Sequence, residues 1–331
     1  MSGSRIAILF LAVGIIGVAW SCDTARHSLS RVTNSDTAAS VETPQPSFDA
    51  DHAYQLVVRQ VTFGPRAPGL PGHDSCRMFL VEFLRQYADT VFEQRFSRQV
   101  YGKLLQLTNV GASFRPELSK RVLLCAHWDT RPYADEDPDP RNRQQPILGA
   151  NDGASGVAVL LEIARILKHH PPPVGIDLLL LDGEDYGKAS DLENFCLGSQ
   201  HAAQNYPFQR SPTWVIVVDL VGDREAWFPW EEYSWHSAPN LLISLWQKGA
   251  RYSSTMFRNE LVGPIYDDHV PFIQRGHRAI VIIDAELVGN RSPNPRRRYW
   301  HTLRDTPENI SSETLRVVGQ TLLDWIYQTQ W

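Results

Sequence analysis

The stretch Arg121-Val122-Leu123-Leu124-Cys125-Ala126-His127-Trp128-Asp129 decides the fold. Residues 122–126 are all apolar, without the alternation of a half-exposed strand, which is typical of a strand covered on both faces. Residues 176–181 and 214–218 are similarly rich in Leu, Ile and Val. Together the three segments predict the centre of a sheet that is buried on both sides.

Helical segments separate these strands. Residues 153–169 place Val157, Leu160, Leu161, Ala164 and Leu167 on one helical face, and the prolines from Pro171 onward end the helix. By similar reasoning we expect further helices over 48–61, 72–87, 240–250 and 312–327, and further strands over 91–96, 104–110 and 279–283. This order predicts an α/β fold: a single domain with a mixed central β-sheet and helices on both faces.

Composition narrows the class of protein. The chain has 331 residues, of which 43% are hydrophobic, enough to bury a sizeable core. Its formal net charge is -5, and the basic run at 296–298 is short. Nucleic-acid binding usually requires a basic surface, so we expect no nucleic-acid partner.

The N-terminal segment has the pattern of an export signal. Arg5 precedes the apolar run 6–20, which is followed by Ser21 and Cys22. Fifteen apolar residues are short for a membrane span, which needs about 20, although an uncleaved anchor helix stays an alternative. We expect a signal peptide over 1–21, a polar, flexible tether over 22–47 and a folded domain over 48–331.

The tetrapeptide Ala19-Trp20-Ser21-Cys22 resembles a bacterial lipoprotein box, in which the cysteine is lipidated. We therefore expect an exported, periplasmic protein anchored to a membrane only through lipid on Cys22. The other cysteines, Cys76, Cys125 and Cys196, have no metal-ligand spacing and are expected to be thiols of the core or the surface.

Carboxylates and imidazoles follow the buried segments. They are His127 and Asp129 after 122–126, Glu184 and Asp185 after 176–181, Asp219 after 214–218, and Asp152 just before the helix 153–169. Open α/β sheets bind ligands at the carboxyl ends of their strands. Carboxylates crowded at one edge repel one another unless a cation is bound, so this pattern predicts a zinc site with an open position.

Each of these residues also has a purely structural interpretation. His127 could be a histidine at a strand end whose ring nitrogens are hydrogen-bonded, Asp152 could cap a helix, and the Glu184-Asp185 pair could be a solvated turn. Asp219 could cap a loop, and the run 267–269 could open a helix. Five such residues in a functional order are harder to explain as coincidence than any one of them.

The order of these motifs resembles the M28 metallopeptidase-like superfamily, whose fold is that of the zinc exopeptidases. The corresponding motifs are His127-Trp128-Asp129, Asn151-Asp152-Gly153, Glu184-Asp185, Asp219 and His301. Finer features are similar to the glutaminyl-peptide cyclotransferases of the animal-like type found in bacteria. These are the segments 182–187, 196–200 and 265–272 and the tryptophan in Trp300-His301-Thr302.

The resemblance implies a zinc-dependent cyclotransferase that converts an N-terminal glutamine of peptides or proteins to pyroglutamate and releases ammonia. It implies a single zinc per chain, held by Asp152, Asp185 and His301. Glu184 is implied as the general base and acid, Asp219 and Asp267 as a hydrogen-bonded acidic pair beside the substrate, and Trp300 as a wall of the substrate pocket. We expect a monomer.

Two departures from the family pattern are visible. Val157 stands where the animal enzymes have the disulfide partner of a cysteine near Cys125, so that bridge is not expected. No tryptophan lies between Asp185 and Trp214, so one pocket wall must be built differently. Phe195 is a candidate for that wall, to which no site role is assigned.

A dizinc aminopeptidase of the same superfamily is the main alternative, since His127 and Asp219 could complete a second metal site. A receptor-like protein with a vestigial site is a third class, but no expected ligand is missing here. Ring closure needs no metal-bound hydroxide, because the nucleophile is the substrate's own amine. This favours one zinc.

Overall fold

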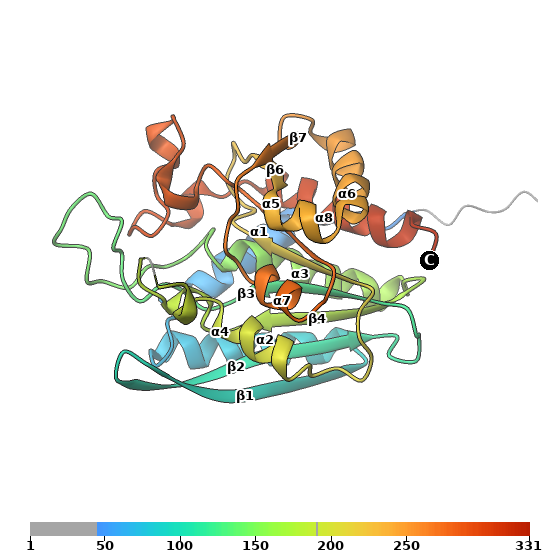
Figure 1. Ribbon diagram of the computed structural model, residues 1–331, viewed down its shortest axis with the longest axis horizontal. Coiled ribbons are helices and arrows are strands. Elements are labelled where there is room, and N and C mark those ends of the chain that lie inside the picture. The colour runs from blue at the N-terminus through green and yellow to red at the C-terminus, as the bar shows by residue number, and fades with distance from the viewer. Residues whose placement is uncertain (1–44, 190) are drawn as a thin grey trace, which may run out of the picture. The chain divides into compact units, whose positions relative to one another are not determined.

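The computed structural model describes residues 45–189 and 191–331, which fall in one compact unit. Its centre is a six-stranded sheet in the order β1-β2-β4-β3-β5-β8 (Figure 1). The strands are β1 (Thr90–Val100), β2 (Lys103–Phe114), β3 (Arg121–His127), β4 (Gly175–Leu181), β5 (Trp214–Asp219) and β8 (Ala279–Ile283).

The sheet is mixed, as predicted. The strands β3, β4, β5 and β8 run parallel to one another, whereas β1 and β2 form an antiparallel hairpin, and β2 pairs antiparallel with β4. All seven residues of β3 and of β4 are buried. The carboxyl ends of the parallel strands therefore lie at the same edge of the sheet.

Helices cover both faces of the sheet. Successive side chains of a strand point to opposite faces, and in β3 Val122 and Leu124 join one core while Leu123 and Cys125 join the other. The first core is closed by α1 (Ala50–Val61), α2 (Pro71–Tyr87), α3 (Ala154–His169), α6 (Pro239–Tyr252) and α8 (Ser312–Gln328). The second is closed by α4 (Leu197–Gln204) and α7 (His269–Gln274), in front of the sheet in Figure 1. The predicted fold class is confirmed.

A second, smaller sheet was not expected from the sequence. β6 (Phe228–Glu231) pairs in parallel with β7 (Phe257–Val262), and α5 (Glu232–Ser237) follows β6 directly. Glu231 is fully buried there, and its carboxylate accepts hydrogen bonds from the backbone N–H groups of Tyr233 (2.8 Å) and Ile265 (3.0 Å). His269 Nε2 lies 2.9 Å from the same carboxylate. Glu231 thus fixes the loop between β7 and α7.

Among the helices of residues 45–189 and 191–331, none combines the length and apolar character that crossing a membrane requires. The expected signal peptide, Cys22 and most of the expected tether lie outside the described residues. The cysteines Cys76, Cys125 and Cys196 are buried and free.

Candidate metal centre and active site

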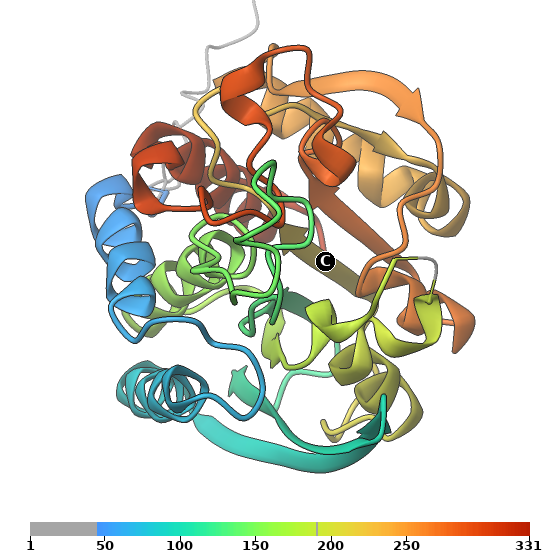
Figure 2. The ribbon, with the colours of Figure 1, turned by 90° about the vertical axis from the view of Figure 1, so that its left-hand side faces the viewer.

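The predicted site residues come from the loops at the carboxyl edge of the sheet, which face the viewer in Figure 2. His127 ends β3 and Asp219 ends β5, while Glu184 and Asp185 follow β4 in a short 3-10 helix, η1 (Glu184–Tyr186). Asp152 comes from the loop before α3, and His301 comes from the loop before α8. Parallel strands place their carboxyl ends together, which explains why residues so distant in the sequence meet here.

Three of these side chains form a potential metal site. Asp152, Asp185 and His301 each offer a ligand atom, and these atoms lie within 4.8 Å of one another. His301 Nε2 is 3.3 Å from Asp185 Oδ1 and 3.5 Å from Asp152 Oδ2. Asp152 Oδ2 and Asp185 Oδ2 are buried and have no hydrogen-bond partner among the described residues, as expected for oxygens that bind a cation. Two carboxylates and an imidazole fit zinc with an open coordination position.

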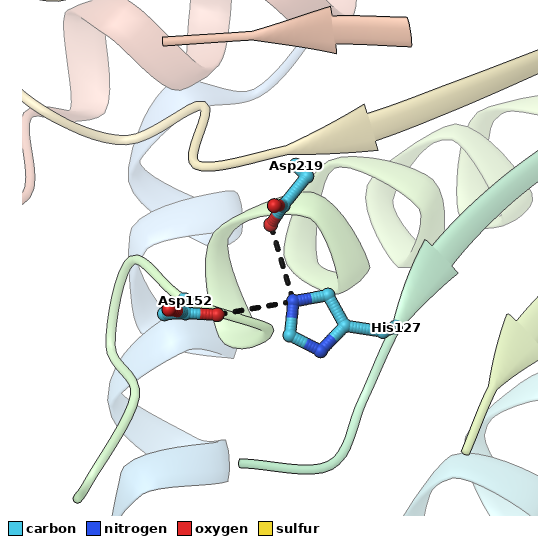
Figure 3. Close-up of side chains that lie close together, drawn as sticks. All are labelled: His127, Asp152 and Asp219. Carbon is cyan, nitrogen blue, oxygen red and sulfur yellow. Dashed lines mark hydrogen bonds and ion pairs between the residues drawn. The ribbon is translucent and has the colours of Figure 1, made fainter. Parts of the chain in front are cut away.

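A second set of potential ligands overlaps the first (Figure 3). His127, Asp152 and Asp219 also bring ligand atoms within 4.8 Å of one another. His127 Nε2 lies between two carboxylates, 3.1 Å from Asp219 Oδ1 and 3.2 Å from Asp152 Oδ1. Asp152 therefore belongs to both sets, and His127 already contacts the two acidic members of its own set directly.

The electrostatics of the cluster favour a bound cation. Burial, and next the negative charge of Asp185, raise the pKa of Asp152. Burial alone would raise the pKa of Asp185 too, but the His301 imidazole and the Arg131 guanidinium outweigh it and lower this pKa to about 2. Asp185 is thus held ionised next to another carboxyl group, and a cation would relieve the repulsion between them.

Glu184 is positioned from its backbone and from its side chain. Its N–H donates to Asp129 Oδ1 at 3.0 Å, and the N–H of Asp185 donates to Asp129 Oδ2 at 3.3 Å. The Cys196 thiol donates to Glu184 Oε1 at 3.3 Å. Burial, and then the charge of Asp185, raise the pKa of Glu184 well above its ordinary value. Such a carboxyl group holds a proton more readily than an ordinary glutamate, as a general acid must.

Sequence reasoning missed several residues that support the site. Arg131 donates to Asp185 Oδ1 at 2.9 Å, and the Asp305 carboxylate accepts from the N–H groups of Asn151 (2.8 Å) and Asp152 (3.0 Å). Arg131 follows the His127-Trp128-Asp129 motif by two residues, so its position just after β3 was an available signal. Asp305 had no such signal, because it acts on a loop that lies about 150 residues earlier in the chain.

Next to the ligand sets lies a cavity of about 70 Å³. Its lining includes Glu184, Asp219, Asp267 and three aromatic side chains, Phe195, Tyr266 and Trp300. The Trp300 ring stacks on His301 with 3.4 Å between ring centroids.

Phe195, the candidate for the wall that lacks a tryptophan, lines the cavity. The guanidinium of Arg131 lies 5.5 Å from the centre of its ring. Gly187 packs so closely against the ring that a Cβ there would lie 2.1 Å from it. Contacts with segments on both sides therefore fix the Phe195 ring.

Asp219 and Asp267, which the family resemblance implies as a hydrogen-bonded pair, both line this cavity, but within the described residues no direct hydrogen bond joins them. Asp219 Oδ1 accepts from the N–H of Leu220 at 2.7 Å, and Asp267 Oδ2 is buried without a hydrogen-bond partner. Burial, and next the charge of Asp219, raise the pKa of Asp267 to about 7. One of the two carboxyl groups is therefore able to carry a proton near neutral pH.

Three residues around the site have a left-handed backbone although none is glycine. They are Cys196 (φ 54°), Leu220 (φ 51°) and His301 (φ 53°). Such conformations are uncommon for residues with a side chain and persist only where the surrounding structure enforces them. They are found here beside Glu184, beside Asp219 and at a potential metal ligand.

The family model of peptidase family M28 matches residues 109–326, and the chain belongs to this family. Within the family, it is similar to glutaminyl cyclases. The crystal structure of Bacteroides thetaiotaomicron glutaminyl cyclase bound to N-acetylhistamine superimposes with a TM-score of 0.81 at 38% identity, covering 87% of this chain and 100% of that one.

Two further relatives are informative. The glutaminyl-peptide cyclotransferase-like protein of Mus musculus is 27% identical over 285 residues, covering 78% of this chain and 70% of the relative. A structure described as a leucine aminopeptidase precursor from Bacteroides thetaiotaomicron matches with a TM-score of 0.81 at 38% identity, covering 87% of this chain and 99% of that one. The second name keeps the peptidase alternative relevant.

Proposed function

We propose that the chain is a zinc-dependent glutaminyl-peptide cyclotransferase, which converts an N-terminal glutamine of peptides or proteins to pyroglutamate with release of ammonia. The observation that carries the proposal is the small cavity in which Glu184, Asp219 and Asp267 face three aromatic side chains beside the metal ligands. A water-sized site needs about 10–15 Å³. The cavity of about 70 Å³ therefore has room for a few heavy atoms, the size of a glutamine side chain.

Asp152, Asp185 and His301 would hold the zinc. The metal, when bound, supplies a Lewis acid for the carbonyl of the side-chain amide. Their buried, unpartnered oxygens and the charge of Arg131 beside Asp185 support this assignment.

Glu184 would move the proton. The α-amine of the substrate attacks its own side-chain amide carbon, a five-membered ring closes and the carbon–nitrogen bond to the amide nitrogen breaks. Glu184 takes one proton from the attacking amine and returns it to the leaving nitrogen, which departs as ammonia. Its raised pKa and its position in the cavity wall support this role.

Asp219 and Asp267 would bind the substrate's amine end. A carboxyl group with a pKa near 7 beside a second carboxylate can share one proton with it and still carry negative charge toward the amine. Trp300 and Phe195 would restrict the flexible side chain to conformations in which nucleophile and carbonyl carbon are close.

We also propose one zinc per chain. His127 Nε2 contacts Asp219 and Asp152 directly, and this supports its action as a hydrogen-bond donor to the acidic residues. A second cation at Asp219 would repel the substrate's amine, whose protonated form is positive. The overlap of the two ligand sets favours the alternative, a dizinc aminopeptidase, so the number of metals separates the two functions.

Export through a signal peptide over 1–21 and lipidation of Cys22 remain proposals that rest on the sequence pattern Ala19-Trp20-Ser21-Cys22. The absence of nucleic acid as a partner and a monomeric state are proposed on composition and on the family resemblance.

The test of function compares two assays on one preparation. We expect ammonia and a pyroglutamyl terminus from peptides that begin with glutamine, measured by a coupled ammonia assay and by the 17 Da mass loss of ammonia. Release of free amino acids from leucyl or alanyl peptides at much higher rates would instead establish an aminopeptidase.

A further inference from the structure

Beside the catalytic cavity lies a larger surface groove of about 580 Å³. Its wall is formed by the end of β1, the 3-10 helix η2 (Leu192–Asn194), α4 and α7. Figure 2 shows α4 and α7 on the side of the molecule opposite α1. The volume is within the range of about 300–1,000 Å³ typical of sites for small organic ligands, so it can hold several residues of a peptide.

The groove and the cavity share a wall. Tyr266 lines both. In the segment between η2 and α4, Phe195 lines the cavity, whereas the residues that line the groove are Leu192, Glu193, Asn194 and Leu197. An N-terminal glutamine in the small cavity must leave the rest of its peptide outside, and the groove adjoins the cavity at their common wall, Tyr266.

The charges of the groove are not balanced. Arg98 and Arg275 both line it, and within residues 45–189 and 191–331 neither forms an ion pair. Arg98 Nε is buried without a hydrogen-bond partner. Glu193 is the single carboxylate among the described lining residues. Most other surface arginines near β1, such as Arg77 and Arg95, are paired with Glu93.

The groove also has an apolar edge. Leu192 is 52% exposed although it is a large hydrophobic residue, and it lines the groove together with Pro271. An exposed leucine beside unpaired arginines suits a chain segment that presents both apolar and acidic side chains.

We propose that this groove binds the residues that follow the N-terminal glutamine of the substrate, and that it selects peptides with acidic side chains there. The proposal rests on the cyclotransferase activity proposed above. Arg98 and Arg275 attract the acidic side chains, Glu193 weakens that attraction, and Leu192 contacts an apolar neighbour. The groove thereby determines which peptides are preferred, whereas the cavity determines that the first residue is glutamine.

The test uses the zinc-loaded full chain and a series of glutamine-initiated pentapeptides with glutamate, alanine or lysine at the third and fourth positions. Glutamine amide, which has nothing to place in the groove, is the control substrate. We expect kcat/KM to rise from lysine to alanine to glutamate, by about twofold to fivefold for each arginine engaged, the size typical of accessible ion pairs. The preference should weaken at high salt.

Variants identify the groups responsible. Arg98→Gln and Arg275→Gln should each reduce the preference for acidic peptides and leave kcat/KM for glutamine amide unchanged, whereas Glu193→Gln should increase the preference. Arg251→Gln, an exposed position on α6 on the other face of the sheet, is the matched control and should change nothing.

Two results would overturn the proposal. Equal kcat/KM for the three peptides in the wild type would show that the groove does not select, while turnover of glutamine amide would leave the cyclotransferase function intact. A preference that persists in both arginine variants would place the selection elsewhere. Failure to release ammonia from glutamine amide itself would reject the proposed function, and so separates the two hypotheses.

Discussion

Exchange of Glu184 for glutamine separates the proton-transfer step from metal binding. The change preserves size, and the amide oxygen can still accept from the Cys196 thiol. The backbone remains bonded to Asp129, so the adjacent ligand Asp185 stays in place. We therefore expect Glu184→Gln to bind zinc as the wild type does but to lose its proton carrier.

The expected loss can be estimated from general acid–base catalysis, which contributes about 10²–10⁴-fold. At about 1.36 kcal/mol for each factor of ten, that is about 2.7–5.4 kcal/mol of transition-state stabilisation. Asp185→Ala should behave differently, because it removes one of three ligands and leaves the Arg131 guanidinium without its buried partner. Its zinc content should fall to near zero together with activity.

Zinc is measured by elemental analysis after dialysis, and kcat is measured by ammonia release from glutamine amide. Glu260→Gln, an exposed glutamate on β7, is the matched control and should match the wild type in both assays. Equal loss of metal in the Glu184 and Asp185 variants would refute the reasoning, because it would make Glu184 a ligand. A kcat of Glu184→Gln close to that of the wild type would refute the role of Glu184 as the general base.

Four shorter predictions concern other residues of the site, the fold and the N-terminal segment. His127→Ala should keep about one zinc per chain and part of the cyclase activity, whereas a fall from two zincs to one with complete loss of turnover in metal analysis would favour the dizinc peptidase. Phe195→Ala should raise KM for glutamine amide about tenfold, about 1.4 kcal/mol, at constant zinc content, and an unchanged KM would remove it from the pocket wall. Burial alone would raise the pKa of Glu231, but the hydrogen bond with His269 and those from backbone N–H groups outweigh burial and lower this pKa below its ordinary 4.5. The ionised Glu231 carboxylate therefore contributes its full stabilisation above pH 4.5 and loses it as the pH falls through the lowered pKa. Urea midpoints of Glu231→Gln should then depend less steeply on pH than those of the wild type in this acidic range, and parallel curves would contradict this. Labelled fatty acid should be incorporated into the wild type but not into Cys22→Ala, and unlabelled wild-type protein free in the periplasm would leave only an ordinary signal peptide.

The sequence predicted the sheet and the edge at which the polar residues gather, because both depend on local patterns. An uninterrupted apolar run such as 122–126 can be recognised without knowing its partners, and a polar residue directly after it must lie at the sheet edge. Asp152, Asp185 and His301 were predicted through motif order, and the structure brings them together.

The parts that were missed depend on contacts between distant segments. Glu231 accepts from Ile265, 34 residues later, and nothing in the short segment Phe228–Glu231 indicates that its last residue is buried. Phe195 was only a candidate, because a single phenylalanine in a loop carries no periodic pattern. Its place in the cavity wall becomes visible only when Arg131 and Gly187 are seen around it.

The left-handed residues around the site have a consequence for engineering. Glycine adopts this backbone region readily, so Cys196→Gly or Leu220→Gly would relieve a conformational strain of order 1–3 kcal/mol per residue. Each exchange would also remove a buried side chain, and for leucine that loss is about 2–5 kcal/mol. The same exchange would loosen the chain beside Glu184 and Asp219, where small displacements slow a reaction that depends on alignment. Relief of backbone strain at these two positions therefore brings no net stability and puts turnover at risk, and thermostable variants of this protein are better sought in the helices that cover the sheet.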